Sequence, residues 1–365
     1  MSNTGSLIVL HIAFVTNNFT SGVSTVVPQY LNAQAGNKDI KVALLNLATD
    51  QLSTAQFPVF FQVPLKELPA PFSTPSLVVF HEIYRPEFPK LSAELIKRSI
   101  PYIITPHGSL TAIAQKQKHL AKSLLNVAFY NRFLQNAECI HFLSEKEATS
   151  SASFNYKKMR IIPNGVNIPE INPIQKKLNV ASFVGRLDIE VKGLDLLINS
   201  LPPIAEELKA LGAGINIYGP DDNGSIEKLT QLIHEHQLGD LVSLKGPISG
   251  QEKAKALRES LFYIQLSRTE GFPTSVLEAL GYGLPIIVTE GTAWKNLAND
   301  KGIGIGVESD LGDISRAILT LFKSTRLRNT MASAAREYVV SNYQWQRISE
   351  QQISLYQEII RGVSR

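Results

Sequence analysis

The sequence predicts an α/β protein made of two parallel-sheet domains. Short apolar runs rich in Ile, Val, Leu and Phe alternate with longer segments of helical periodicity, the pattern of parallel units with strands covered on both faces. A turn-rich segment over residues 161–177 contains three prolines, one glycine and three asparagines, and the same alternation starts again after it. We therefore expect two facing domains with a cleft between them.

The first half of the chain contains five candidate strands and three candidate helices. We expect strands at residues 7–15, 40–46, 76–81, 101–105 and 139–143, and helices at 24–35, 90–98 and 111–135. The first run, LIVLHIAFV, has no Lys or Arg before it and no small-residue cleavage site after it, so a buried strand explains it better than a signal peptide. It is also too short to cross a bilayer.

The second half repeats the pattern after residue 177. Strands are expected at 180–185, 215–219, 241–244, 261–266 and 284–289, and helices at 193–201, 224–237, 250–259 and 274–281. Open parallel sheets bind ligands at the C-terminal ends of their strands, which places the expected site in the cleft. The final segment 343–361 is helical from Ile353 onward, and its own pattern leaves open which domain it packs on.

Composition excludes several classes of protein. The 36 basic and 32 acidic residues give a formal net charge of +4, which suits an anionic substrate or contact with an anionic membrane surface but is too small to indicate nucleic acid. The single cysteine, Cys139, excludes an intramolecular disulfide and lies in an apolar run, so we expect a buried structural thiol and a reducing compartment. These features favour a cytoplasmic protein, with peripheral contact at the inner membrane face left open.

The segment EGFPTSVLEALGYGLP, residues 270–285, has the features of an anion site. It follows an expected strand, and Thr274 or Ser275 can cap the helix that begins there. The free amides of that first turn suit a phosphate, and Gly271 lets the backbone approach a ligand. Glu278 lies one turn after Thr274 and can accept two hydrogen bonds from a ribose diol, while Glu270 can reach the sugar beyond the diphosphate.

A second segment, FVGRLDIEVKG, supplies fixed positive charge. Arg186 and Lys192 bracket the strand–helix connection that opens the second domain, where they can offset the charge of a diphosphate. Charge grows on the diphosphate when a sugar leaves, so preorganised cations stabilise the transition state more than the ground state. No Asp-x-Asp follows an expected strand, and Asp188 and Glu190 lie beside the two cations. Metal independence is therefore favoured.

The first domain offers a histidine at a strand end. His107, in the segment PHGS, can hydrogen-bond a donor hydroxyl or help to organise the transferring sugar; the alternative is that it only caps the following helix. The loop TSGVS, residues 20–24, can bring backbone amides towards a diphosphate. It matches neither the dinucleotide nor the Walker A pattern, which counts against redox chemistry and ATP hydrolysis. The basic face of 111–135 is better explained as solvated than as membrane-binding.

Taken together, these residues resemble the family 4 retaining glycosyltransferases of the GT-B fold. The matching pieces are EGFPTSVLEALGYGLP, VGRLDIEVKGLDLLI, IIPNGVN, TPHGSL and HFLSEKE. The resemblance implies two facing Rossmann-like domains and a C-terminal helix that crosses back to the first. The domains are then expected at residues 1–168 with 345–365, on the acceptor side, and at 169–344, on the donor side.

The resemblance also implies roles for individual residues. Arg186 and Lys192 would bind the diphosphate, Glu278 the ribose, Glu270 the donor sugar, and His107 would approach that sugar from the first domain. Further substrate contacts are implied for Gly271, Phe272, Pro273, Thr274 and Ser275, for Gly246 and Ile248 in a base pocket over Leu244–Ile248, and for Gly22 and Val23. The first-domain loop departs from the family pattern, because Ser21 and Gly22 stand where many members carry two adjacent glycines.

The expected reaction is the transfer of a sugar from a nucleotide diphosphate sugar to a glycan or a lipid-linked saccharide, with retention of anomeric configuration and no cofactor or metal. UDP is favoured as the nucleotide by family frequency alone. No protein nucleophile is generally agreed for this family, and a same-face displacement assisted by the leaving phosphate is the usual proposal. The alternatives are a nucleotide-sugar 2-epimerase, a sugar phosphorylase of the same fold, or a non-catalytic nucleotide-sugar-binding subunit.

Overall fold

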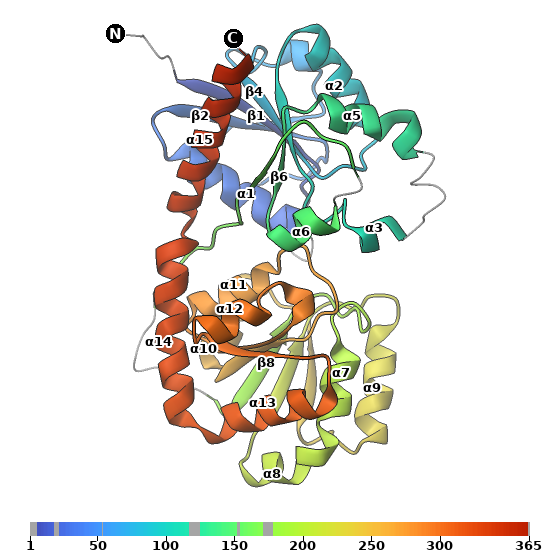
Figure 1. The fold of residues 1–365 in the computed structure, drawn as a ribbon, viewed down its shortest axis with the longest axis vertical. Coiled ribbons are helices and arrows are strands. Elements are labelled where there is room, and N and C mark those ends of the chain that lie inside the picture. The colour runs from blue at the N-terminus through green and yellow to red at the C-terminus, as the bar shows by residue number, and fades with distance from the viewer. Residues whose placement is uncertain are drawn as a thin grey trace. The chain divides into compact units, whose positions relative to one another are not determined.

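The chain forms two compact units in a computed structural model that describes residues 6–17, 22–52, 54–116, 125–151, 154–170 and 178–363 (Figure 1). Unit 1 comprises Met1–Gly165 with Trp345–Arg365, and unit 2 comprises Val166–Gln344. The sequence placed the first boundary three residues later, after residue 168. Part of the expected connection, residues 171–177, lies outside the described residues.

Unit 1 contains a seven-stranded parallel sheet in the order β3-β2-β1-β4-β5-β6-β7. Its strands are β1 (Leu7–Ala13), β2 (Ile40–Asn46), β3 (Val59–Phe61), β4 (Leu77–His81), β5 (Tyr102–Thr105), β6 (Cys139–Phe142) and β7 (Met159–Ile161). β1 ends two residues before the expected Val15, whose amide donates to the Asn46 side chain at 2.9 Å instead of to a neighbouring strand. Cys139 is fully buried, as expected, and burial raises the pKa of its thiol to about 12.

The helices of unit 1 flank this sheet. They are α1 (Gly22–Ala35), the 3-10 turn η1 (Leu65–Glu67), α2 (Glu87–Lys97), α3 (Ala112–Lys116), the π-helical turn η2 (Asn126–Tyr130), α5 (Asn131–Asn136), α6 (Glu145–Ser150) and α15 (Trp345–Val363). Of the helix expected over 111–135, residues 117–124 lie outside the described residues, and the described remainder is helical as α3, η2 and α5. The π turn η2 shifts the helical register between Leu125 and α5.

Both faces of the unit 1 sheet are buried at its central strands, such as β1 and β4, which explains why these strands are mostly apolar. Val9 points into a cluster with Tyr30 of α1 and Tyr356 of α15. The next residue, Leu10, points to the opposite face, where Phe88 of α2 packs. Successive side chains of a strand alternate between faces, so one strand supplies both cores.

The C-terminal helix α15 belongs to unit 1. It packs on α1, where the Tyr30 and Tyr356 hydroxyls lie 2.8 Å apart and Trp345 Nε1 donates to Gln29 Oε1 at 3.1 Å (Figure 1). The sequence pattern alone left this placement open. The helix that the family resemblance implied for the first domain is confirmed.

Unit 2 contains a six-stranded parallel sheet in the order β10-β9-β8-β11-β12-β13. Its strands are β8 (Val180–Val184), β9 (Gly214–Tyr218), β10 (Val242–Gly246), β11 (Phe262–Gln265), β12 (Ile286–Thr289) and β13 (Gly304–Val307). The sequence located the first five to within two residues at either end. β13 was missed because its sequence, GIGV, is half glycine.

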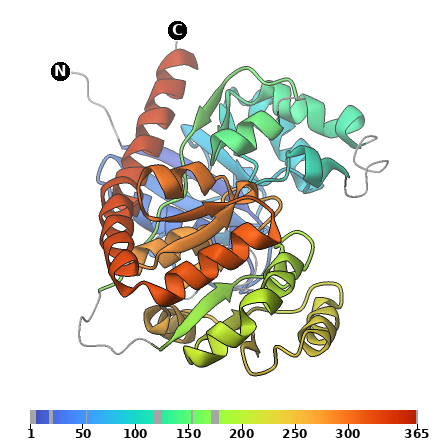
Figure 2. The ribbon, with the colours of Figure 1, turned by 60° about the horizontal axis from the view of Figure 1, so that its bottom comes forward.

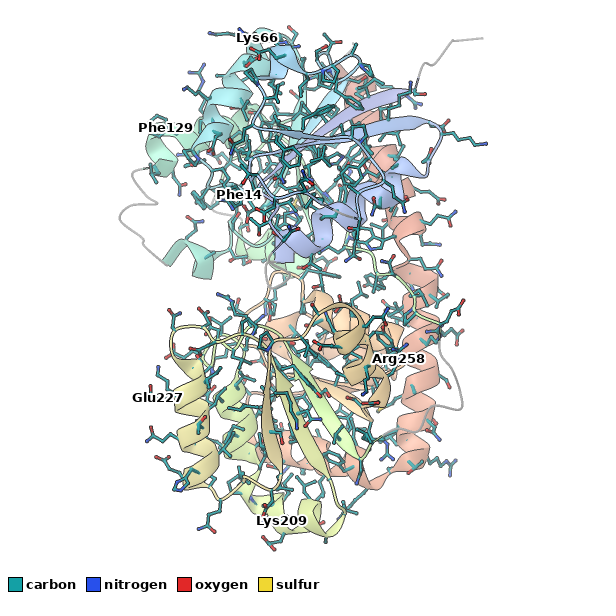
Figure 3. The ribbon with its side chains drawn as sticks, turned by 180° about the vertical axis from the view of Figure 1, so that it is seen from behind. Phe14, Lys66, Phe129, Lys209, Glu227 and Arg258 are labelled. Carbon is teal, nitrogen blue, oxygen red and sulfur yellow. The ribbon has the colours of Figure 1, made fainter. Side chains whose placement is uncertain are left out.

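Two groups of helices cover this sheet. The elements are α7 (Leu194–Ser200), η3 (Pro202–Ile204), α8 (Ala205–Ala210), α9 (Ser225–Glu235), α10 (Gly250–Glu259), α11 (Thr274–Gly281), η4 (Glu290–Thr292), α12 (Lys295–Asp300), α13 (Leu311–Lys323) and α14 (Thr325–Asn342). α7, α9 and α13 share one apolar cluster, and α7 and α13 lie side by side (Figure 2). α11, α12 and α14 share the other. Lys209 of α8 and Glu227 of α9 extend outwards, exposed (Figure 3).

The fold is thus two parallel sheets, each covered on both faces by helices. Among the described residues, no helix is long and apolar enough to cross a membrane.

The packing of α15 gives a stability prediction. Ile348 is fully buried in the cluster that joins α15 to the sheet, so Ile348→Ala should cost about 2–5 kcal/mol and lower the urea midpoint of unit 1. Val363, near the end of the same helix, is 48% exposed, and Val363→Ala should change stability by less than about 0.5 kcal/mol. Equal effects of the two substitutions would show that α15 is not part of the core.

Candidate functional site

The predicted donor-side residues Arg186 and Glu270 lie at the C-terminal edge of neighbouring strands of unit 2. Arg186 follows β8 and Glu270 follows β11, Asp222, which was not predicted, follows β9, and β8 is paired with both other strands. The loops are joined by backbone bonds, because the Leu187 amide donates to Pro220 O at 2.9 Å and the Arg268 amide to Val191 O at 2.9 Å. One continuous edge of the sheet therefore presents all three side chains.

An ion pair forms the centre of this edge. Lys192 Nζ lies 2.5 Å from Glu270 Oε1, and the side chains are only 16% and 13% exposed. Glu270 Oε1 also accepts from Ser267 Oγ at 2.8 Å and from Gln265 Nε2 at 3.0 Å. The lower dielectric of a mostly buried site strengthens such contacts, so the positions of Lys192 and Glu270 are well defined.

Polar contacts continue from this pair to the start of α11. Gln265 Oε1 accepts from Ser275 Oγ at 3.3 Å, and the Tyr263 hydroxyl lies 2.8 Å from the same oxygen. Burial raises the pKa of Tyr263 well above its ordinary value, so its hydroxyl stays neutral. Sequence reasoning missed Tyr263, Gln265 and Ser267. Their signal was available, because polar residues at every second position of a buried strand all face one side.

The start of α11 differs from the expectation in one respect. Pro273 occupies the N-cap position and no side chain caps the helix, so the expected capping by Thr274 or Ser275 is wrong. Ser275 Oγ bonds to Gln265 instead. Among the described residues, no acceptor binds the Thr274 and Ser275 amides, which a first helical turn leaves free for a ligand.

Arg186 is held on the other side of the edge. Its Nη1 lies 2.8 Å from Asp222 Oδ2, its Nη2 lies 4.0 Å from Asp188, and half of its side chain is exposed. Asp222, in the turn after β9, is thus an ion-pair partner of Arg186. A half-exposed pair of this kind contributes little stability, so Arg186 can exchange Asp222 for a stronger anion.

Glu278, the predicted ribose ligand, pairs with Lys253 of α10, which sequence reasoning also missed. Both side chains are about one quarter exposed. The predicted base-pocket residue Ile248 and the predicted substrate residue Phe272 pack against the same apolar cluster. Gly246 has a left-handed φ of +75° and an open space around its α-carbon.

Gly193 fixes the loop that carries Lys192. Its φ is +63°, and a β-carbon at this position would lie 2.0 Å from Leu266 O at the end of β11. Only glycine permits this close approach, which presses the loop after β8 against the strand that leads to Glu270.

The predicted residue of unit 1, His107, lies in a constrained loop after β5. Its φ is +51°, and its Nε2 lies 3.0 Å from Nδ1 of His81, the last residue of β4. The next amide, of Gly108, donates to Glu147 Oε1 at 2.5 Å, while Glu147 Oε2 accepts from the Leu143 amide at 2.7 Å. Burial raises the pKa of Glu147, and these two amide bonds oppose that shift. In the first turn of α3, the Ala114 amide donates to Thr111 Oγ1 at 3.4 Å, and no described hydrogen bond joins His107 to that helix. A ligand-binding role for His107 stays a prediction.

The other substrate contacts predicted for unit 1 involve Gly22 and Val23, at the start of α1. Gly22 begins α1, and Val23 is buried in the core, so only their backbone can meet a ligand. The preceding residues of the loop, 18–21, lie outside the described residues. No group of three His, Cys, Asp or Glu side chains in the described part of the chain is arranged to hold a metal ion.

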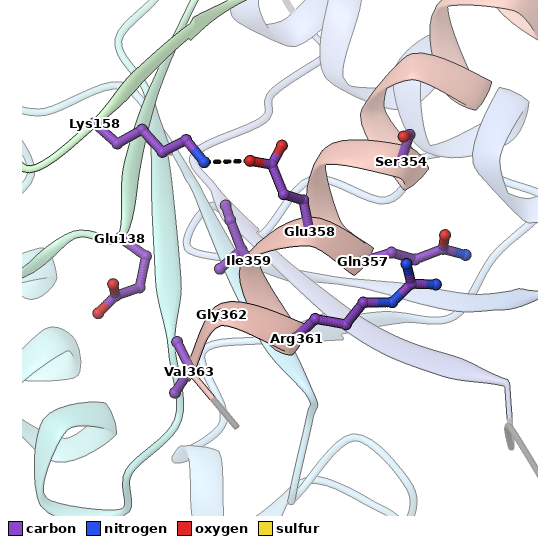
Figure 4. A pocket seen from close by; sticks show the side chains of 9 residues that line it. All are labelled: Glu138, Lys158, Ser354, Gln357, Glu358, Ile359, Arg361, Gly362 and Val363. Atoms are coloured by element: carbon purple, nitrogen blue, oxygen red, sulfur yellow. Dashed lines mark hydrogen bonds and ion pairs between the residues drawn. The ribbon is translucent and has the colours of Figure 1, made fainter. Parts of the chain in front are cut away.

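A separate groove of unit 1 contains none of the predicted site residues. It lies at the end of α15, where Lys158, the residue before β7, pairs with Glu358 across the groove and Glu138 and Arg361 form part of its walls (Figure 4). Its charged residues largely neutralise one another, and the sequence motifs lie elsewhere.

The fold and the strand-edge site define a glycosyltransferase of the GT-B class. The family profile described as glycosyl transferases group 1 matches residues 166–338, and the profile of glycosyltransferase family 4 matches residues 52–169. The chain therefore belongs to the family 4, group 1 glycosyltransferases.

Individual proteins agree with this assignment. An uncharacterized glycosyltransferase of Methanocaldococcus jannaschii is 28% identical over 265 residues, which cover 72% of this chain and 70% of that protein. The phosphatidyl-myo-inositol mannosyltransferase of Mycobacterium leprae is 24% identical over 212 residues, 56% of this chain and about half, 54%, of that protein. The crystal structure of Anabaena HepE in complex with UDP and glucose superposes with a TM-score of 0.73 at 17% identity, covering 96% of this chain and all of that one, and shares its fold.

The close contact at Gly193 gives a prediction. Gly193→Ala should destabilise unit 2 by more than about 2 kcal/mol, because a left-handed backbone and a collision with Leu266 O both oppose a β-carbon. Gly239 has open space around its α-carbon and no left-handed φ, so Gly239→Ala should be neutral or slightly stabilising. Urea unfolding of the two variants measures the difference. If Gly193→Ala were as stable as the Gly239 variant, the loop would not be pressed against β11.

Buried histidines give a second prediction, on pH. Burial lowers the pKa of His11 and of His107 to about 3 and that of His141 to about 4, and lowers that of His81 well below its ordinary value. In the unfolded chain these groups titrate near 6.5, so between pH 6.5 and 4 the unfolded state binds more protons. Stability should be full above pH 6.5 and fall as the pH decreases, by up to about 1.4 kcal/mol per histidine at pH 5.5.

Melting temperatures at pH 7.5, 6.5 and 5.5 test this dependence. His141→Phe removes one of these groups. The slope of the unfolding free energy against pH should therefore decrease by the contribution of about one proton. A melting temperature that does not change across this range would contradict the neutral state of these histidines.

Proposed function

We propose that this chain transfers a sugar from UDP-sugar to a glycan or a lipid-linked saccharide, with retention of anomeric configuration and without a metal ion. The observation that supports this most directly is the mostly buried Lys192–Glu270 pair, connected through Gln265 to the first turn of α11. It combines a cation for a diphosphate, a carboxylate for sugar hydroxyls and free helix amides at one sheet edge.

In this proposal, unit 2 holds the donor. Lys192 has three ammonium hydrogens and uses one for Glu270, so it can bind a phosphate oxygen while the pair persists. Arg186 and the Thr274 and Ser275 amides complete the diphosphate contacts. Glu278 accepts from the ribose hydroxyls, oriented by Lys253. Two cations and a helix N-terminus offset the charge that a metal ion would otherwise neutralise.

The proposed reaction needs no covalent enzyme intermediate. The bond between the sugar C1 and the β-phosphate oxygen breaks, and its electron pair remains on the phosphate, where Lys192 and Arg186 stabilise it. The acceptor hydroxyl oxygen bonds to C1 on the face that the phosphate leaves. Its proton passes to an oxygen of the departing phosphate, so the products are the glycoside with retained configuration and UDP.

The choice of nucleotide and acceptor draws on similar proteins. HepE, which shares this fold, was solved with UDP and glucose, and the name of the Mycobacterium leprae relative describes mannosyl transfer to phosphatidyl-myo-inositol. These names favour a UDP-sugar and a lipid-linked acceptor. A nucleotide-sugar 2-epimerase would release UDP without an acceptor, a phosphorylase would need inorganic phosphate, and a non-catalytic subunit would release none.

Lys192→Ala tests the proposal. It should lower kcat/KM by about 100–1,000-fold with UDP-sugar, because it removes a charge that stabilises the leaving phosphate. Lys209→Ala is the control, since Lys209 is exposed on α8, which leads into the start of β9 at the opposite edge of the sheet. UDP release is measured with and without acceptor, and the anomeric configuration of the product by NMR.

Acceptor-dependent UDP release with retained configuration supports the proposal. An inverted product, or full activity of Lys192→Ala, would contradict it.

A further inference from the structure

We propose that His81, His11 and Gln34 are positioning residues that fix the tautomer of His107, with its proton on Nε2 and a lone pair on Nδ1. His107 then acts as a hydrogen-bond acceptor for a substrate hydroxyl. The role of that hydroxyl rests on the proposed function, but the tautomer of His107 does not.

A continuous chain of side-chain hydrogen bonds runs through unit 1. His107 Nε2 lies 3.0 Å from His81 Nδ1, His81 Nε2 lies 3.0 Å from His11 Nδ1, and His11 Nε2 lies 3.0 Å from Gln34 Oε1. The three rings are stacked, with centroids 5.3 Å apart at each step and interplanar angles of 26° and 23°. The chain therefore links the ends of β4 and β5 to the interior of β1 and to α1.

The bonding pattern couples the three tautomers. A neutral imidazole has one N–H donor and one acceptor nitrogen, and both nitrogens of His81 and His11 are used in the chain. Gln34 Oε1 can only accept, so His11 carries its proton on Nε2 and accepts at Nδ1. His81 must then donate from Nε2 and accept at Nδ1. His107 in turn donates from Nε2, which leaves its Nδ1 without a proton.

The orientation of the Gln34 amide is set by α15. Gln34 Nε2 donates to Gln352 Oε1 at 2.9 Å and to the Tyr356 hydroxyl at 3.0 Å. Tyr356 is in turn 2.8 Å from the Tyr30 hydroxyl. The series of hydrogen bonds thus has α15 at one end and His107 at the other.

The reversed chain is the competing arrangement. Turning over the Gln34 and Gln352 amides would reverse every bond and put the His107 proton on Nδ1. It would also relieve Gln352 Nε2, a buried donor without a partner among the described residues. Against it, the reversed chain forces three imidazoles into Nδ1–H, the less stable tautomer of a neutral histidine side chain. We take the Nε2–H arrangement on this ground.

The surroundings keep the chain neutral. Besides one another, the described titratable groups that contact or act on these rings are Tyr30, Tyr356 and His141, and none of them is an anion at neutral pH. The Glu147 carboxyl lies at the His107 end, where it is bound by the Gly108 amide. His141 is bound separately, to Thr105 Oγ1 at 3.1 Å and to Ile162 O at 2.7 Å. Burial lowers the pKa of His107 to about 3, so it is a poor base.

At the exposed end, His107 Nδ1 makes no hydrogen bond within the described residues, and the side chain is partly exposed. Nδ1 can therefore meet a ligand. A lone pair on a neutral, weakly basic nitrogen selects a hydroxyl donor, such as a sugar hydroxyl, and does not bind a phosphate oxygen, which has no proton to give. The hydrogen-bonded series of histidines thereby assigns His107 to the sugar and not to the diphosphate.

The first test measures the tautomer in the free full-length protein. The protein is labelled with 15N-histidine, and long-range 1H–15N correlation spectra distinguish Nε2–H, Nδ1–H and charged rings among the seven histidines. Signals are assigned from single substitutions of each histidine. At pH 7, His11, His81 and His107 should all be neutral with the proton on Nε2. A His107 ring that is charged, or protonated on Nδ1, would overturn the proposal whatever the activity.

The second test uses two substitutions of His81. His81→Asn retains an oxygen near the position of Nδ1 and should keep the His107 tautomer. His81→Phe retains ring volume but no acceptor, so His107 should become a mixture of tautomers, and kcat/KM should fall about tenfold, the equivalent of one ordinary hydrogen bond. His141→Phe, which removes a buried histidine outside the chain, should leave the His107 signals unchanged.

Melting curves show whether each variant is folded. Equal His107 spectra in the Asn and Phe variants at position 81 would contradict a positioning role. The predicted spectra in a protein that transfers no sugar would retain the tautomer assignment and reject the proposed function, so the two failures can be told apart.

Discussion

The ion pair between Lys192 and Glu270 is the constraint on which the candidate donor site depends. It joins the loop after β8 to the loop after β11, which are also pressed together at Gly193 and Leu266. Through Gln265 the same contacts reach α11, so a cation, a carboxylate and free helix amides are fixed relative to one another. Sites that stabilise a leaving anion gain from such preorganisation, because little reorganisation remains for the reaction step.

Much of the fold could be predicted from the sequence, because strands buried on both faces are continuously apolar and turn residues separate them. The pattern failed where this signal is weak. β3 and β7 have three residues each, β7 is exposed, and β13 alternates glycine with apolar residues. The placement of α15 depended on the resemblance, because an amphipathic helix does not itself specify which surface it covers.

The candidate site was predictable as a set of residue types but not as a set of contacts. Arg186, Lys192, Glu270 and Glu278 could be found because they follow strands in recognisable segments. Their partners could not, since Lys192 and Glu270 are 78 residues apart and only the pairing of β8 with β11 brings them together. The hydrogen-bonded series of histidines is a stronger example, because its Gln34 is bonded to Gln352, which is 318 positions away in the sequence. Local patterns hold no information about such contacts.

The central claim is that Lys192 and the first turn of α11 hold the leaving diphosphate. A crystal structure of the protein with UDP tests it most directly. The account predicts the β-phosphate in contact with Lys192 Nζ and with the Thr274 and Ser275 amides, and the ribose hydroxyls on Glu278. A diphosphate bound elsewhere on the chain, or held only by a metal ion, would contradict it.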